Sequence, residues 1–140
     1  NVYNPYHAHL QKLIDRTAKK FGFCLVLDCH SMPSKICNIM QDNRQIEFCL
    51  GTLFEQSCPS EMYEFFMQHL KQKYNVSLDC PYSFNYCQPR KNIYTLQMEI
   101  NRSLYEDESV YKKNQNFQYV SSDICAAIID LANFLLDFKK

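Results

Sequence analysis

The run Leu27-Asp28-Cys29-His30-Ser31 holds the residue types in this sequence that are best suited to chemistry. Residues two apart in a β-strand share one face, so Asp28 and His30 would point the same way. They end an apolar run, and open α/β sheets bind ligands beyond the carboxyl ends of their strands. A neutral imidazole there could bind a metal ion while the neighbouring carboxylate orients it. The pattern fits equally well a strand end at which His30 bonds into the following loop.

A second candidate lies between Thr95 and Arg102, where polar and apolar residues alternate. The polar members are Gln97, Glu99 and Asn101. A row of polar side chains is costly on a central strand unless the row faces a cavity or a partner. On an edge strand the same row faces water. Glu99 would face a functional site only if the strand is central, and the pattern alone favours the edge strand.

The elements that must position these residues are predicted from periodicity and from helix-capping residues. Asn4 is expected to cap the first helix, Gly22 to end it, and the segment 121–123 to cap the last one. The run after Gly22 is apolar on both faces, which is typical of a buried, parallel strand. The sequence predicts helices over 5–21, 59–70 and 124–138, and strands over 23–30, 46–54, 75–80 and 93–101.

Helices alternate with strands in this order, which indicates an α/β fold with a mixed, mostly parallel sheet and flanking helices. The chain has 140 residues, 46% of them apolar. That length and composition suit a single domain over 1–140 with a packed core.

Charge and composition exclude several classes of protein. Fifteen basic residues balance fifteen acidic ones, so no basic excess points to nucleic acid. No uninterrupted apolar run reaches the roughly 18 residues of a membrane helix, and no signal peptide is visible at the start. Two glycines are too few for a glycine-rich phosphate loop. None of the eight cysteines forms a CxxC pair, so we expect reduced structural thiols in a cytoplasmic protein.

Several motifs, taken together and in this order, resemble the C-terminal part of the N-formylglutamate amidohydrolase family over nearly the whole chain. The segments over 28–33 and 96–105 are the most specific. The motifs are Tyr6-His7-Ala8-His9-Leu10, Asp28-Cys29-His30-Ser31-Met32-Pro33, Leu50-Gly51-Thr52 with Ser57-Cys58, Pro81-Tyr82, and Leu96-Gln97-Met98-Glu99-Ile100-Asn101-Arg102-Ser103-Leu104-Tyr105.

The resemblance implies a phosphorylase/hydrolase-like fold of the zinc carboxypeptidase type, lacking its N-terminal part. It also implies a zinc-dependent hydrolase that cleaves the formyl amide of N-formylglutamate, or of another small N-acyl amino acid, the last step of one histidine-degradation route. His30 would be a zinc ligand and Glu99 the general acid/base. Asp28, Gln97 and Arg102 would support these groups or bind substrate. The alternative is a metal-free remnant of the family that acts as a binding module.

Three departures from the family pattern bear on these expectations. The family's first zinc ligands lie in a segment N-terminal to the start of this chain. Ser83-Phe84-Asn85-Tyr86 stands where the family has a glycine pair and an arginine that contact substrate, and Tyr94 replaces a frequent His.

Two surfaces look too apolar for the predicted half-sheet to cover. Cys24 and Val26 mark one, and Cys125, Ile129 and Leu136 mark the other. We therefore expect a homo-oligomer or a partner segment on them.

Overall fold

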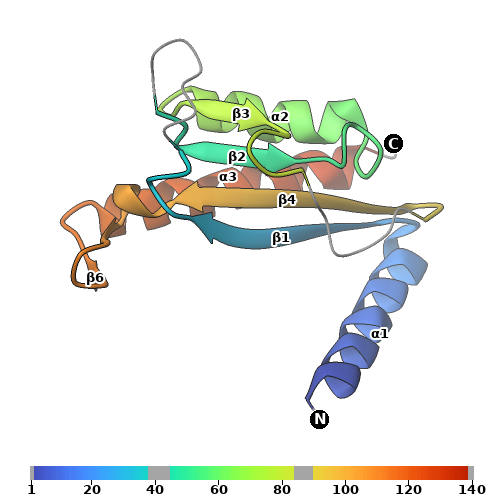
Figure 1. Ribbon diagram of the computed structural model, residues 1–140. Coiled ribbons are helices and arrows are strands. Elements are labelled where there is room, and N and C mark those ends of the chain that lie inside the picture. The colour runs from blue at the N-terminus through green and yellow to red at the C-terminus, as the bar shows by residue number, and fades with distance from the viewer. Residues whose placement is uncertain (1, 38–44, 84–89, 139–140) are drawn as a thin grey trace.

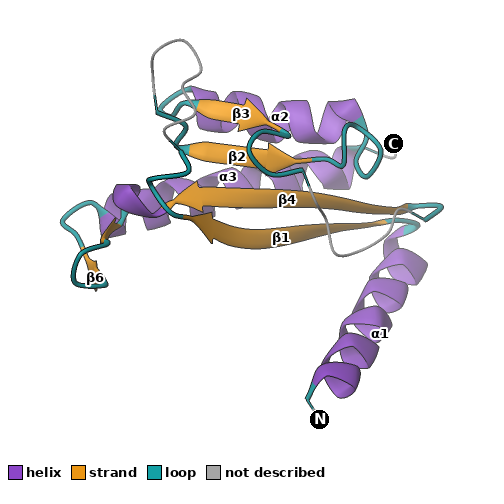
Figure 2. Cartoon of the chain, in the orientation of Figure 1, coloured by secondary structure: helices purple, strands orange, loops and turns teal. Residues whose placement is uncertain are grey.

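The computed structural model describes residues 2–37, 45–83 and 90–138, and Figures 1 and 2 show the arrangement of its elements. Ten elements follow one another along the chain. They are α1 (Tyr3–Phe21), β1 (Cys24–Met32), β2 (Phe48–Gly51), α2 (Ser60–Lys71), β3 (Val76–Leu78), β4 (Ile93–Asn101), the 3-10 turn η1 (Arg102–Leu104), β5 (Glu106–Asp107), β6 (Lys112–Lys113) and α3 (Phe117–Asp137).

Four strands form the main sheet, in the order β1-β4-β2-β3. β1 pairs with β4 in parallel and β2 with β3 in parallel, while β2 and β4 are antiparallel. The predicted mixed, mostly parallel α/β sheet is confirmed. The edge-strand interpretation of residues 93–101 is wrong, because β4 has a neighbour on each side. The prediction of a buried first strand is also wrong in part, since β1 is parallel but forms an edge of the sheet and is half-exposed along most of its length.

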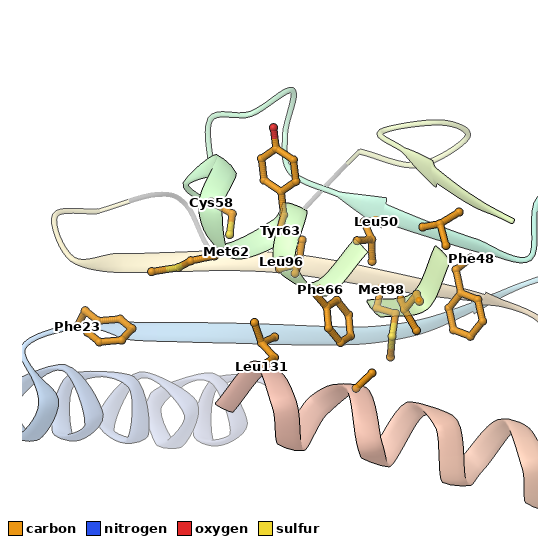
Figure 3. Close-up of a cluster of buried hydrophobic side chains, with 13 residues drawn as sticks. Phe23, Phe48, Leu50, Cys58, Met62, Tyr63, Phe66, Leu96, Met98 and Leu131 are labelled. Atoms are coloured by element: carbon orange, nitrogen blue, oxygen red, sulfur yellow. The ribbon is translucent and has the colours of Figure 1, made fainter. Parts of the chain in front are cut away.

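The main core lies on the face of the sheet that α2 and α3 cover (Figures 1 and 3). Phe66 of α2 and Leu131 of α3 meet Leu50, Leu96 and Met98 of the sheet there. Alternation along the strands sends their remaining side chains to the opposite face. The row of polar residues on β4 lies on that second face, away from α2 and α3.

α1 packs against one end of the sheet and points away from it (Figure 1). Its buried residue Ile14 contacts Cys24 and Ile93, so Cys24 is covered and the expectation of an apolar surface there is wrong. Gly22 ends the helix with a φ of 83°, as predicted, because that left-handed conformation favours glycine. The helix begins one residue before Asn4, so the predicted Asn4 cap is wrong and Val2 takes that position.

α3 begins at Phe117, so the predicted cap over 121–123 lies inside the helix instead. Asp123 has a different role, because its carboxylate accepts a hydrogen bond of 2.5 Å from Lys73 Nζ and one of 2.7 Å from Tyr74 Oη. These bonds join the end of α2 to α3 and lower the pKa of Asp123. The sequence predicts Asp123 as part of a helix cap, but in the structure its side chain links two helices.

The outer side of α3 is apolar and exposed. Ile129 and Leu136 are 60% and 65% exposed, and Cys125 is exposed as well. By length and composition alone, Phe117–Asp137 is apolar enough to cross a membrane, although polar residues interrupt its apolar run. In the structure the other side of this helix packs on the core of a mixed sheet.

Two adjacent phenylalanines of α2 test this packing. Phe66 is fully buried, whereas Phe65 is 36% exposed and stacks on Phe134. We expect Phe66→Ala to lower the free energy of unfolding by about 3–5 kcal/mol, since it leaves a cavity under the sheet. Phe65→Ala should cost less than half as much, because water can occupy the space. Urea denaturation measures both, and equal losses would contradict the described orientation of α2.

Candidate functional site

The register between β1 and β4 brings the two candidate segments together. Asp28 lies opposite Gln97, and His30 lies opposite Glu99. Opposite residues of neighbouring strands share a face, so all four side chains gather on the face away from α2 and α3. The structure confirms that His30 and Glu99 are side by side on one sheet.

His30 and Asp28 contact each other on the edge strand. His30 Nε2 lies 3.0 Å from Asp28 Oδ1, and the two side chains are 48% and 28% exposed. A neutral imidazole that donates from Nε2 keeps its lone pair on Nδ1. Asp28 thus orients the ring and makes Nδ1 the nitrogen able to bind a ligand, which is the relation expected from their spacing.

Glu99 is the buried acid of the site, only 6% exposed. Its Oε1 accepts a hydrogen bond of 3.0 Å from Gln97 Nε2, and its Oε2 has no hydrogen-bond partner among the described residues. Burial raises the pKa of the Glu99 carboxyl, and the Asp28 carboxylate adds to the rise, while His30 and Arg102 act in the opposite direction. A buried carboxyl with a raised pKa, and with one oxygen that accepts no hydrogen bond from the described residues, suits proton transfer.

Arg102 supplies the positive charge at the carboxyl ends of β1 and β4. Its Nε donates to Ser31 Oγ over 3.2 Å, which ties the turn η1 to the edge strand. The guanidinium counteracts the rise in the pKa of Glu99. Hydrogen bonds from Ser34 lower the pKa of Glu108, and the charge of Arg102 adds a smaller contribution in the same direction. Arg102 is thus placed to bind an anionic group near the acid.

β2 adds residues to this face that sequence reasoning did not single out for the site. Cys49 lies opposite Glu99, and Gly51 lies opposite Gln97. The Cys49 thiol donates to the carbonyl oxygen of Tyr82 over 3.2 Å. The only available signal was the motif Leu50-Gly51-Thr52, whose strand partner the sequence does not specify.

Other candidate residues lie elsewhere. His69 pairs with Asp130 of α3 over 3.2 Å, at the boundary between α2 and α3. The ring of His7 lies edge-on to Tyr3 and Tyr6 within α1. Tyr94 belongs to the main core on the opposite face of the sheet. In the loop that replaces the family's glycine pair, residues 84–86 fall outside the described part of the chain.

The number of metal-binding side chains at the site shows whether they could hold a zinc ion. A catalytic zinc ion takes three protein ligands and one open position. No group of three His, Cys, Asp or Glu side chains able to hold a metal ion occurs within 2–37, 45–83 and 90–138. His30, with its orienting carboxylate, can provide one ligand, so these residues do not complete a zinc site by themselves.

Comparison with known proteins places the chain in a family. The family model described as N-formylglutamate amidohydrolase matches residues 1–106, about three quarters of the chain. This chain belongs to the N-formylglutamate amidohydrolase family. The match includes β1 and β4, which carry the gathered side chains.

Individual relatives agree with this assignment. The N-formylglutamate deformylase of Pseudomonas putida is 29% identical over an alignment of 115 residues that covers 77% of this chain and 43% of the relative. The corresponding protein of Pseudomonas aeruginosa is 26% identical over 114 residues, 76% of this chain and 42% of its own length. A crystal structure of the N-formylglutamate amidohydrolase of Ralstonia eutropha superposes with a TM-score of 0.84 at 26% identity, covering 95% of this chain and 52% of that one. The chain thus spans about half the length of these relatives.

The burial of Glu99 predicts a pH-dependent effect on stability. Glu99→Gln removes a charge that folding must desolvate, so at neutral pH we expect the free energy of unfolding to rise by about 1 kcal/mol. Folding raises the pKa of Glu99 above its ordinary value of 4.5. As the pH rises from 4.5 through the raised pKa, the ionisation of Glu99 increasingly destabilises the folded state. Above the raised pKa this loss of stability is complete. Below both values the acid is protonated in both states and the gain should vanish.

Urea denaturation over a pH series measures this gain. Glu64→Gln on the exposed side of α2 is the matched control and should show no such trend. A gain from Glu99→Gln that is equal at about pH 4 and about pH 8 would contradict the burial argument.

Proposed function

We propose that this chain carries the proton-transfer half of an amidohydrolase site that acts on N-formylglutamate or a related small N-acyl amino acid. The observation that carries the proposal is the buried carboxyl of Glu99 beside His30, on the face of the sheet not covered by α2 and α3. Family membership supports the reaction class, because the two relatives from Pseudomonas are named N-formylglutamate deformylase.

Hydrolysis of an amide needs a group that removes a proton from water and returns one to the leaving nitrogen. Glu99 suits both steps, because burial raises the pKa of its carboxyl toward the range in which an acid can also serve as a base. Gln97 holds one carboxyl oxygen by its hydrogen bond of 3.0 Å and leaves the other for water or substrate.

The remaining residues would bind the substrate and the metal ion. Arg102 is proposed to bind a carboxylate of the substrate, since a guanidinium matches a carboxylate in charge and geometry. His30, oriented by Asp28, is proposed as one ligand of a zinc ion whose other ligands lie outside the described residues. Such an ion would supply a water molecule of lowered pKa. A cytoplasmic role in histidine degradation is part of this proposal.

The second candidate is a metal-free binding module built on the same fold. It is favoured by the donor set, because one imidazole beside a carboxylate binds zinc weakly compared with three ligands. In that case Arg102 and Gln97 would still hold an N-acyl amino acid, but no hydrolysis would follow.

The chain incubated with N-formyl-L-glutamate, with and without added zinc, distinguishes the two functions. If the chain is the enzyme, we expect formate release that needs zinc and that falls by about 10²–10⁴ in Glu99→Gln, the range typical of general acid/base groups. His30→Ala should abolish the release that depends on added zinc. Elemental analysis of the purified chain gives the zinc content directly.

Calorimetric titration with the same compound covers the alternative. Binding without formate release, weakened by Arg102→Ala, would favour the binding module. Glu64→Gln, outside the site, is the control for both assays. If the chain alone shows no formate release and no binding, both functions are rejected for it.

The exposed apolar side of α3 predicts association. Ile129 and Leu136 are exposed there, and a groove of about 290 Å³ between α1, β1 and α3 is lined by Phe21, Phe23 and Leu135 among others. Such surfaces are usually covered in soluble proteins, and β1, the edge strand of the described sheet, adjoins this one. We therefore expect the 140-residue chain to form dimers or larger species at micromolar concentration.

Light scattering measures the mass of the species. Ile129→Lys combined with Leu136→Lys should shift it toward the monomer without loss of helical signal. A stable monomer of the unmodified chain would contradict the prediction.

A further inference from the structure

Gly51 is the residue on β2 that lies opposite Gln97 across the antiparallel ladder. We propose that Gly51 is a positioning residue of the site: its missing side chain lets Gln97 lie across β2 and hold Glu99 in place. The inference rests on the proposed role of Glu99 and extends it to a strand that carries no acid or base of the site.

The space around Gly51 carries the argument. A Cβ atom placed on Gly51 would lie 2.6 Å from Gln97 Oε1 and 3.1 Å from Gln97 Cβ. Directly opposed residues of an antiparallel pair normally keep their Cβ atoms about 4.5–5.5 Å apart. The Gln97 side chain therefore occupies the volume that any other residue at this position would need.

The space for a side chain at Gly51 is closed on a second side as well. The carbonyl oxygen of Tyr82 lies 3.3 Å from the same Cβ position, so backbone closes another side of this space. Thr95 and Asn101, on the same face of β4, are fully buried. A methyl group on Gly51 would therefore displace the Gln97 amide, which is itself only 5% exposed.

The orientation of Gln97 shows what that displacement would break. Its Oε1 lies against Gly51 and has no hydrogen-bond partner among the described residues, while its Nε2 donates to Glu99 Oε1. Leaving a buried acceptor without a partner is costly, so the fold retains this orientation at the expense of stability. In return, this orientation of the Gln97 amide allows its Nε2 to donate the hydrogen bond to Glu99 Oε1.

The conformation of Gly51 does not explain the glycine. The other glycine of the chain, Gly22, has a positive φ that favours glycine, but Gly51 has no such conformation. A requirement for space, rather than for backbone freedom, distinguishes Gly51 from Gly22.

The side-chain amide protons of Gln97, observed by NMR in the ¹⁵N-labelled chain and assigned by their loss in Gln97→Ala, test the proposal without any assay of activity. In the unmodified chain we expect them to exchange with water at least about tenfold more slowly than those of the exposed Gln68. In Gly51→Ala this protection should be lost. Retained protection would overturn the proposal.

Formate release supplies the second measurement. If the chain hydrolyses N-formyl-L-glutamate, Gly51→Ala should lower kcat about tenfold with little change in KM, because it disturbs the acid rather than binding. In a Gln97→Ala background, where the amide is gone, the further loss from Gly51→Ala should be less than about twofold. A full additional loss there would contradict action through Gln97.

Gly22→Ala is the matched control. It should reduce stability because of the positive φ, yet leave the Gln97 amide signals unchanged. If Gly51→Ala fails to fold, recovery of folding in the double variant with Gln97→Ala supports the proposal, and failure of both variants overturns it. Absence of hydrolysis by the unmodified chain would reject the proposed function while the amide signals still decide the role of Gly51.

Discussion

The parallel pairing of β1 with β4 is the interaction on which the rest of the structure depends. It sets His30 opposite Glu99 and Asp28 opposite Gln97. A shift of one residue would turn one strand's polar row into the core beneath α2 and α3. Leu96 and Met98 prevent that shift, because both are fully buried on the helix-covered face. The apolar packing of one face therefore fixes the chemistry of the other.

The two faces of the sheet differ in what covers them, and this asymmetry explains the site. α2 and α3 cover one face with a continuous apolar core, while α1 reaches only the end of the other near Cys24 and Ile93 (Figure 1). The polar row between Gln97 and Asn101 is buried, and none of the helices among the described residues packs over it. β1 is an edge strand of the described sheet, and the outer side of α3 is exposed. The chain spans about half of its relatives' length.

Within the site, polar groups are held at a cost in stability. Glu99 Oε2 and Gln97 Oε1 are both buried without a hydrogen-bond partner in the described part of the chain. Such groups are rare in cores and are characteristic of functional sites, where a ligand or water completes them. Arg102 offsets part of the cost through its charge, which acts against the rise in the pKa of Glu99. The glycine on β2 provides the room for this arrangement.

The sequence by itself determined the α/β class, the approximate positions of the main helices and strands, and the family, because periodicity and local motifs are properties of neighbouring residues. It also singled out Asp28, His30 and Glu99, whose alternation fixes the face of each strand. Only the tertiary structure decided that β4 is central and β1 is an edge, since strand order depends on contacts between distant segments. The same holds for Asp123, which local pattern assigns to a cap, and for Gly51, whose partner is 46 residues away in Gln97. Long-range packing sets these roles, and no local pattern encodes it.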